Sequence, residues 1–172
     1  MSYKEKITEA MQMLASNERV IFIGQGLWYP GHVMYSSLES ISKDRKIELP
    51  VIEDVQMGMS TGLSLMGFLP VSIYPRMDFL ILAMNQLVNH LDKLAQMSKG
   101  EFKPKVIIRT MVGTKEPMDS GPQHTQDHTR GLREMLKTIP VLTIETEGKV
   151  MQTYKYALKT EKSVVIIEFG NL

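Results

Sequence analysis

The chain has 172 residues, of which 43% are apolar and 23% are charged, a composition typical of a globular protein with one sizeable core. Its 20 Lys and Arg residues nearly balance its 19 Asp and Glu residues, so no basic surplus indicates a nucleic acid or an anionic membrane as a partner. The sequence contains no cysteine, which excludes disulfides, thiolate metal sites and a catalytic thiol.

The N-terminal residues carry no targeting pattern. Residues 1–6 are charged and lead directly into an amphipathic stretch, without the apolar core of a signal peptide. No apolar run approaches the roughly 18 residues that a membrane-spanning helix needs. We therefore expect a cytoplasmic protein that does not enter a membrane.

Six short apolar runs predict buried β-strands. Most of the runs are continuous rather than alternating, which is typical of strands that are covered on both faces. The predicted strands are Val20–Ile23, Leu49–Ile52, Phe68–Tyr74, Val106–Arg109, Val141–Ile144 and Val164–Ile167.

Helical patterns lie between these strands. The longest carries a continuous apolar stripe and begins at Asp78, which we predict as its N-cap. The predicted helices are Lys4–Ala15, His32–Ser40, Val55–Met66, Asp78–Met97, His128–Lys137 and Gly148–Leu158. This alternation predicts an α/β fold over residues 1–172, a single domain with a mostly parallel sheet of about six strands and helices on both faces.

Ligands of such sheets bind beyond the carboxyl ends of the strands, so the residues that follow the strands are the candidates for function. The segment Met111–Asp127 is the longest stretch without periodicity. It contains glycine, proline and several polar residues, and we interpret it as a functional loop.

Glu53 directly follows the apolar run Leu49–Ile52 and precedes a predicted helix. A carboxylate at this point of the crevice is suited to general acid–base work or to binding a cofactor. The same position also suits an acid in the first turn of a helix, where it interacts favourably with the helix dipole. The pattern alone favours the second interpretation.

His124 and His128 are four residues apart, a spacing that allows a zinc site on one helix face. However, Gly121-Pro122 predicts a loop at His124, and no third ligand has a matching spacing. We therefore expect no metal site. A loop histidine that follows a strand is better suited to carry a proton or to contact a substrate.

Two further motifs have structural as well as functional explanations. Tyr74 and Phe79 flank a predicted strand end and helix start, which suits core packing or an aromatic platform for a flat ring. Small residues recur along one side of Gly58–Gly67, without the spacing of a phosphate-binding loop. This pattern predicts close packing against a neighbouring element, in the same chain or in another subunit.

Taken in order, these motifs resemble the beta subunit of the 2-oxo acid dehydrogenase decarboxylating component. More broadly, they are similar to the pyrimidine-binding domain of the transketolase-like thiamine-diphosphate enzymes. The resemblance extends from about Lys4 to Leu172. It includes Val20–Gly24, Leu49–Glu53, Gly67–Val71, Asp78-Phe79, Asn85–Asn89, Lys93–Ser98, Gly121–Gln126 and Ile167–Phe169.

The resemblance gives Glu53 the role of the glutamate that hydrogen-bonds the 1′ nitrogen of the cofactor's aminopyrimidine ring, which reverses the interpretation from the pattern alone. A proton shared there favours the imino form of the ring, whose nitrogen can remove the proton of the thiazolium carbon. Phe79 matches the aromatic residue that packs on the pyrimidine, with Tyr74 as a second cofactor contact. His124 matches the histidine that faces the substrate. Further candidates for substrate contact are Gln25, Gln123 and His128.

The chain also departs from the pattern of the family. Gly24-Gln25-Gly26 stands where the beta subunits usually carry acidic residues, and the family's further C-terminal domain is missing. The usual diphosphate–magnesium signature, Gly-Asp-Gly followed by a distant Asn, is missing too. The resemblance therefore implies a partner subunit that supplies the diphosphate site and Mg²⁺, most simply in a hetero-oligomer with two copies of each subunit. We expect the interface at Gly58–Gly67 and Asn85–Asn89.

The function that the resemblance implies is the pyrimidine-binding subunit of a split thiamine-diphosphate enzyme. Its small-molecule substrate would be a 2-oxo acid, decarboxylated with acyl or aldehyde transfer, which Gln123–Gln126 favours over transketolase-type two-carbon transfer. The missing C-terminal domain leaves the transketolase-type reaction open. The remaining alternatives are a scaffold subunit that kept the fold without catalysis and a thiamine-sensing module.

Overall fold

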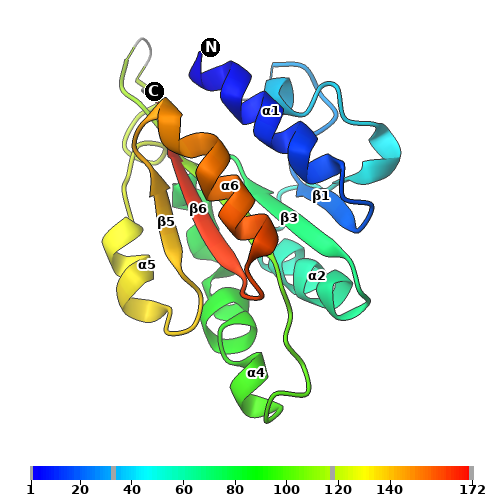
Figure 1. The fold of residues 1–172 in the computed structure, drawn as a ribbon. Helices are drawn as coiled ribbons and strands as arrows, with labels where there is room; N and C mark the ends of the chain where they lie inside the picture. Colours follow the sequence, from blue (N-terminus) through cyan, green and yellow to red (C-terminus); the bar gives the residue numbers. More distant parts are fainter. Residues whose placement is uncertain (1, 32–33, 117–118, 171–172) are drawn as a thin grey trace.

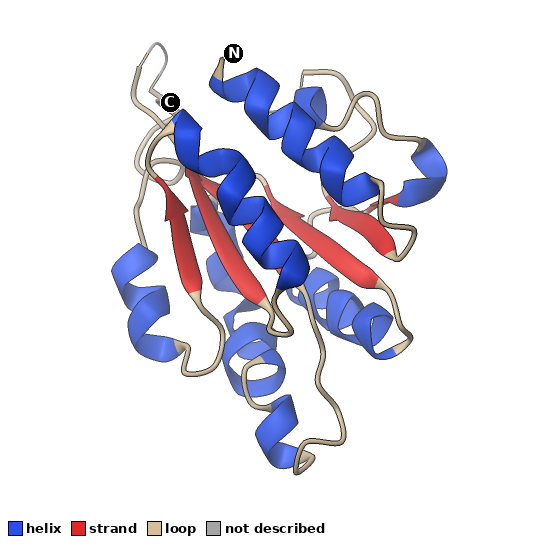
Figure 2. Ribbon diagram, viewed as in Figure 1, coloured by secondary structure: helices blue, strands red, loops and turns tan. Residues whose placement is uncertain are grey.

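A computed structural model describes residues 2–31, 34–116 and 119–170. Its strands form a six-stranded sheet in the order β2-β1-β3-β4-β6-β5, and all neighbouring strands are parallel. The strands are β1 (Val20–Gly24), β2 (Lys46–Glu48), β3 (Leu69–Tyr74), β4 (Ile107–Val112), β5 (Val141–Ile144) and β6 (Val164–Phe169). Helices lie on both faces of the sheet (Figures 1 and 2), which confirms the predicted α/β architecture.

One pair of helices packs in the core on one face of the sheet, and other helices pack in the core on the opposite face (Figure 1). The pair is α1 (Tyr3–Ala15) and α6 (Val150–Lys159). On the opposite face α2 (Glu53–Leu65), α3 (Met77–Leu80) and α5 (Thr129–Met135) supply core residues, whereas α4 (Leu94–Met97) has no buried residue. The π-helix is η4 (Asn85–Leu91), and the 3₁₀ turns are η1 (Tyr35–Ser37), η2 (Lys43–Arg45), η3 (Ile81–Ala83) and η5 (Glu147–Lys149). Within the described part of the chain, no helix has the length and apolar character needed to cross a membrane.

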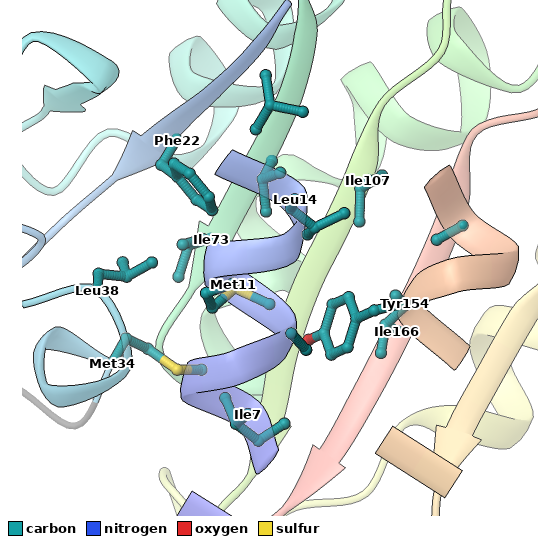
Figure 3. Close-up of a cluster of buried hydrophobic side chains, with 14 of the residues drawn as sticks. Ile7, Met11, Leu14, Phe22, Met34, Leu38, Ile73, Ile107, Tyr154 and Ile166 are labelled. Carbon is teal, nitrogen blue, oxygen red and sulfur yellow. The ribbon is translucent and has the colours of Figure 1, made fainter. Parts of the chain in front are cut away.

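The continuous apolar runs of the strands supply two separate cores. Successive residues of a strand point to opposite faces, so Val164 and Ile166 pack with α1 and α6, while Val165 and Ile167 pack with the helices of the other face. Figure 3 shows the first core, in which Met11 of α1 and Tyr154 of α6 lie over the strands. This two-sided burial explains why these strands read as continuous rather than alternating.

A buried ion pair crosses the first core. Arg109 of β4 donates from Nε to Glu168 Oε1 of β6 at 2.7 Å and from Nη2 to Oε2 at 3.1 Å. Both residues are 2% exposed. The Tyr154 hydroxyl donates to Glu168 Oε1 at 2.5 Å, and Arg109 Nη1 donates to Ser37 Oγ at 2.9 Å. Burial alone would lower the pKa of Arg109, but the adjacent Glu168 carboxylate raises it above its usual value. The ion pair therefore stays charged and joins the two strands to α6 and η1.

The predicted strand Leu49–Ile52 is wrong. The strand at this point is β2, Lys46–Glu48, which pairs with β1 at the edge of the sheet. Pro50 has no N–H to donate to a strand neighbour, and the side chains of Val51 and Ile52 are 62% and 37% exposed. These apolar residues therefore form a surface loop between β2 and α2.

The predicted helix Asp78–Met97 is not continuous. It is divided into α3, the 3₁₀ turn η3, the π-helix η4 and α4. Asp78 is not an N-cap, because Arg76 holds that position and Asp78 is buried as the second residue of α3. The predicted helix His32–Ser40 is reduced to the 3₁₀ turn Tyr35–Ser37, and His32 lies outside the described residues.

Some of the small residues of the Gly58–Gly67 stretch pack within the chain. A Cβ on Gly58 would lie 3.8 Å from the Gln86 side chain of η4, and Ser60 is fully buried against β3. The predicted packing against a neighbour is found at these two positions, whereas Gly62 and Gly67 are exposed and a Cβ on either would meet nothing within 4 Å. The outward side of α2 still exposes Val55, Met59 and Leu65.

Asp92, at the end of η4, fixes the connection between α5 and β5. Its carboxylate accepts backbone N–H bonds from Thr138 at 2.8 Å and from Ile139 and Lys137 at 3.1 Å. Burial would raise the pKa of Asp92, but these bonds and that from the Lys93 ammonium lower it to about 2. The ionised form is therefore the one that the folded state prefers.

We expect Asp92→Asn to lower the free energy of unfolding by about 1–3 kcal/mol at pH 7, because an amide loses the charge-assisted bonds. The folded-state pKa lies below the unfolded value of 3.8, so this stabilisation is present above pH 4 and is lost as the pH falls through the range from 3.8 to about 2. Urea unfolding of both proteins at pH 7 and pH 3 measures the difference. If the difference in the free energy of unfolding between the two proteins is not smaller at pH 3 than at pH 7, this account is contradicted.

Candidate active site

The chain reverses its direction across the sheet between β1 and β3. From β1 the chain proceeds to β2 on one side, whereas β3 pairs with β1 on the other side. Such a switch point opens a crevice beyond the carboxyl ends of the strands, where ligands of parallel sheets bind. A Cβ on Gly24, the last residue of β1, would lie 2.5 Å from the Ile73 carbonyl oxygen. Only glycine permits this close approach of the two strand ends.

Glu48, at the end of β2, holds the loop that follows β1. Its carboxylate accepts backbone N–H bonds from Gly26 and Leu27 at 2.6 Å each, and from Trp28 at 3.0 Å. The partly buried Gln25 lies in this loop. Sequence reasoning missed Glu48 because it placed the strand at Leu49–Ile52. With β2 in its actual position, an acid at the carboxyl end of a strand would have been the signal.

Glu53 is the first residue of α2 and is 8% exposed. Its backbone carbonyl accepts a hydrogen bond from the Tyr74 hydroxyl at 3.3 Å. Within residues 2–31, 34–116 and 119–170, no donor reaches its carboxylate. Glu53 is thus held beside the end of β3, and its carboxylate remains available to a ligand.

A buried polar network fixes the first turns of α2 on β3. Gln56 Nε2 donates to Ser72 Oγ at 3.1 Å and to the Ile73 carbonyl at 2.9 Å. The Ser72 hydroxyl lies 3.5 Å from that of Tyr74, which in turn reaches Glu53. Tyr74 is 1% exposed, and its burial raises the pKa of its hydroxyl above the usual value. Tyr74 therefore lies behind Glu53 as a support, and its predicted contact with a cofactor remains a prediction that this burial disfavours.

Phe79 and His124 come together from different parts of the chain. Phe79 belongs to α3, and His124 lies in the loop between β4 and α5. Their ring centroids are 5.3 Å apart, and the rings meet edge to face at 81°. The Nδ1 atom of His124 is buried and has no hydrogen-bond partner in the described part of the chain. The imidazole is therefore oriented by an aromatic contact and keeps a free ring nitrogen.

Two residues hold the His124 loop against the strand ends. A Cβ on Gly113, just beyond β4, would lie 2.0 Å from the His124 carbonyl oxygen, so glycine is required there. Asp78 Oδ1 accepts hydrogen bonds from the Gln126 backbone N–H at 3.2 Å and from Gln126 Nε2 at 3.0 Å. The residue predicted as a helix cap thus anchors the functional loop beside Phe79.

His128 and Gln123 have different surroundings from His124. The His128 backbone N–H donates to Met77 Sδ at 3.0 Å, and its side chain lines a mostly apolar cavity of about 280 Å³ between α3 and α5. Gln123 is exposed in the loop. Among the residues that the structure describes, no three His, Asp or Glu side chains are grouped to hold a metal ion.

Comparison with known sequences identifies distant relatives. No protein-family model matches the chain. The pyruvate dehydrogenase E1 component subunit beta of Cyanidium caldarium is 26% identical over 167 residues, which are 90% of this chain and 47% of the relative. The chloroplastic subunit beta-4 of Oryza sativa subsp. japonica is 31% identical over 127 residues, or 72% and 30% of the two chains. A 3-methyl-2-oxobutanoate dehydrogenase subunit beta of Mycobacterium tuberculosis is 28% identical over 134 residues, which are 74% of this chain and 38% of the relative.

Comparison with solved structures identifies the fold. A structure described as a split gene transketolase in an inactive beta4 tetramer has a TM-score of 0.71 at 19% identity, over 96% of this chain and 49% of that one. Transketolase from Campylobacter jejuni has a TM-score of 0.75 at 15% identity, and the match covers 95% of this chain and 25% of that one. The chain has a transketolase-like fold, and it spans about half or less of the length of these relatives.

Proposed function

This chain is a distant homologue of the E1 beta subunits of 2-oxo acid dehydrogenases, and we propose that it is the pyrimidine-binding subunit of a split thiamine-diphosphate enzyme. The proposed substrate is a 2-oxo acid, decarboxylated with transfer of the remaining acyl or aldehyde group. The single observation that carries this proposal is the buried Glu53: no donor among the described residues reaches its carboxylate, while its backbone carbonyl accepts a hydrogen bond from Tyr74.

The chemistry of Glu53, Phe79 and His124 suits the cofactor's aminopyrimidine ring and its substrate. Glu53 can exchange a proton with a ring nitrogen, because a carboxylate both accepts and donates one. Phe79 offers an aromatic surface that is only partly buried, and the His124 imidazole, which meets that ring edge to face, can hold or move a proton at the substrate. Thiamine diphosphate itself would supply the carbon that attacks the substrate carbonyl.

The surface around this crevice is suited to a partner subunit. Apolar side chains are exposed at the start of α2 and on η3, in an area where a soluble monomer would gain from polar residues. They are Val51, Ile52, Val55, Ile81 and Leu82. We propose that a second polypeptide covers them and contributes the diphosphate site with its Mg²⁺, in a hetero-oligomer of the two chains.

Calorimetric titration with thiamine diphosphate and Mg²⁺ tests this proposal. The protein is the complex of this chain with the product of its neighbouring gene. We expect binding by the complex and at least about tenfold weaker binding after Phe79→Ala, because the ring loses its stacking surface. Phe102→Ala is the matched control, since Phe102 is an exposed phenylalanine in the loop after α4.

The possible results separate the proposal from its alternatives. Binding that Phe79→Ala weakens and Phe102→Ala leaves unchanged supports a pyrimidine site in this chain. No binding by the complex would contradict the proposal and favour a scaffold subunit. Equal binding by this chain alone would favour a thiamine-sensing module.

A further inference from the structure

Arg76 places a cation beside the His124 loop. It follows β3 and is the N-cap residue of α3, directly before the segment that contains Asp78 and Phe79. Its Nε atom lies 3.4 Å from the position that a Cβ would take on Gly113, and the same position lies 2.0 Å from the His124 carbonyl oxygen. The guanidinium group is therefore close to the loop that carries the candidate catalytic histidine.

The hydrogen-bonding capacity of Arg76 is mostly unused. A guanidinium has five N–H donors, and in the described part of the chain only Nη1 is engaged, with the Pro75 carbonyl at 3.2 Å. The salt bridges within 4.0 Å that the described residues form do not include Arg76. Neither oxygen of Asp78 hydrogen-bonds to Arg76: Oδ1 accepts from Gln126, and the buried Oδ2 has no partner among the described residues.

The surroundings of Arg76 strengthen its attraction for an anion. Arg76 is partly buried, and burial lowers the pKa of its guanidinium while the nearby Asp78 carboxylate opposes that change. Arginine nevertheless remains protonated at any physiological pH. A charged group that has lost part of its water, and that forms no salt bridge with the described residues, is stabilised by a ligand anion. The planar guanidinium matches a carboxylate or a phosphate.

We propose that Arg76 binds an anionic group at the far end of the substrate, a carboxylate or a phosphate that stays on the product. This inference rests on the proposed function, because it concerns the same crevice. It adds a requirement for the substrate: a second anionic group besides any carboxylate that is lost as carbon dioxide.

The chemistry of decarboxylation explains why the leaving carboxylate is not the ligand. Its negative charge moves away from the carboxyl group as the carbon–carbon bond breaks. A cation paired with that group would stabilise the bound substrate more than the transition state and would slow the reaction. A cation that binds a distant anion stabilises the bound substrate and the transition state equally, so it improves the affinity and the orientation of the substrate.

Matched pairs of substrates test the inference in the complex of this chain with its partner. The pairs are 2-oxoglutarate with 2-oxopentanoate, and fructose 6-phosphate with fructose, which differ mainly in the distal anion. We expect the wild-type complex to prefer the member of one pair that carries the distal anion, and the pair that shows this preference identifies that anion as a carboxylate or a phosphate. Arg76→Gln should lower kcat/KM for that substrate by roughly 10- to 100-fold, the effect of losing a charged hydrogen-bonded pair. It should change kcat/KM for the analogue without the distal anion by less than about 3-fold. Arg76→Lys should retain part of the preference.

Two controls keep the inference separate from the proposed function. Arg19→Gln removes an exposed arginine just before β1, at the opposite end of the sheet, and should leave the preference unchanged. Titration with thiamine diphosphate is run on every variant, and glutarate and inorganic phosphate serve as unreactive probes of binding. No cofactor binding by the wild-type complex would refute the proposed function itself. If Arg76→Gln binds the cofactor normally and keeps its preference for the distal anion, only the role of Arg76 is overturned. The same holds if Arg76→Gln fails to assemble with the partner subunit while Arg76→Lys assembles.

Discussion

Replacing Glu53 by glutamine is expected to lower kcat of the complete enzyme by roughly two to four orders of magnitude, the usual contribution of a positioned proton-transfer group. Glutamine has nearly the same size and can still form a hydrogen bond, but it cannot take up or release the proton. Glu53 is already fixed at its backbone by Tyr74, so the substitution should leave the fold of α2 in place. Steady-state turnover of the assembled complex measures the effect, with a thermal melt to verify folding.

Asp54→Asn is the matched control for this prediction. Asp54 is the next residue of the same helix turn and is exposed. If Glu53 only stabilised the helix dipole, both substitutions would cost a few tenths of a kcal/mol of stability and leave turnover intact. A near-normal kcat in Glu53→Gln would therefore restore the structural interpretation that the sequence pattern alone favours.

Arg109→Met is expected to lower the free energy of unfolding by about 3–5 kcal/mol, because it leaves the buried Glu168 carboxylate without its counter-charge. Arg109 is the only bidentate partner of Glu168 among the described residues, and the Tyr154 hydroxyl alone cannot neutralise that charge. Unfolding in guanidinium chloride, followed by circular dichroism, measures the loss.

The double variant Arg109→Met, Glu168→Leu separates the cost of an unpaired charge from the worth of the ion pair. Removing both charges should restore a substantial part of the lost stability, because apolar groups of similar size can replace a buried pair. Arg133→Met is the control, since Arg133 is exposed on α5. A loss below about 1 kcal/mol in Arg109→Met would mean that water reaches the pair in the folded protein.

The sequence predicts the central strands well because they are buried on both faces. Val164–Ile167 is apolar at every position, and each residue packs in one of the two cores. The same criterion fails for β2. Its residues Lys46–Glu48 lie at an edge of the sheet, where polar side chains are tolerated, while the apolar Val51 and Ile52 that follow are exposed. Apolar character reports burial in the assembled protein, and here it marks a surface that we propose for a partner.

In the candidate site, the sequence predicts the residues proposed for chemistry but not the residues that support them. The chain order predicts Glu53, Phe79 and His124 as site residues, and the structure brings Phe79 and His124 together. The support beneath them is not visible in the same way. Asp78 has the pattern of a helix cap but holds Gln126, and Glu48 holds the loop after β1. Such contacts join residues that are 20 to 50 positions apart, and no local periodicity encodes them.

The order of the strands in the sheet also determines when each strand can pair during synthesis. β5 has one strand neighbour in the described sheet, β6, which lies between it and β4 and is made after both of them. The first four strands can pair as they leave the ribosome, but β5 must wait with its backbone unpaired until β6 inserts beside it. Until then β4 also presents an open edge with an unpaired Arg109, a template for pairing with other chains. Protection by a chaperone or an early subunit contact would matter most during this interval.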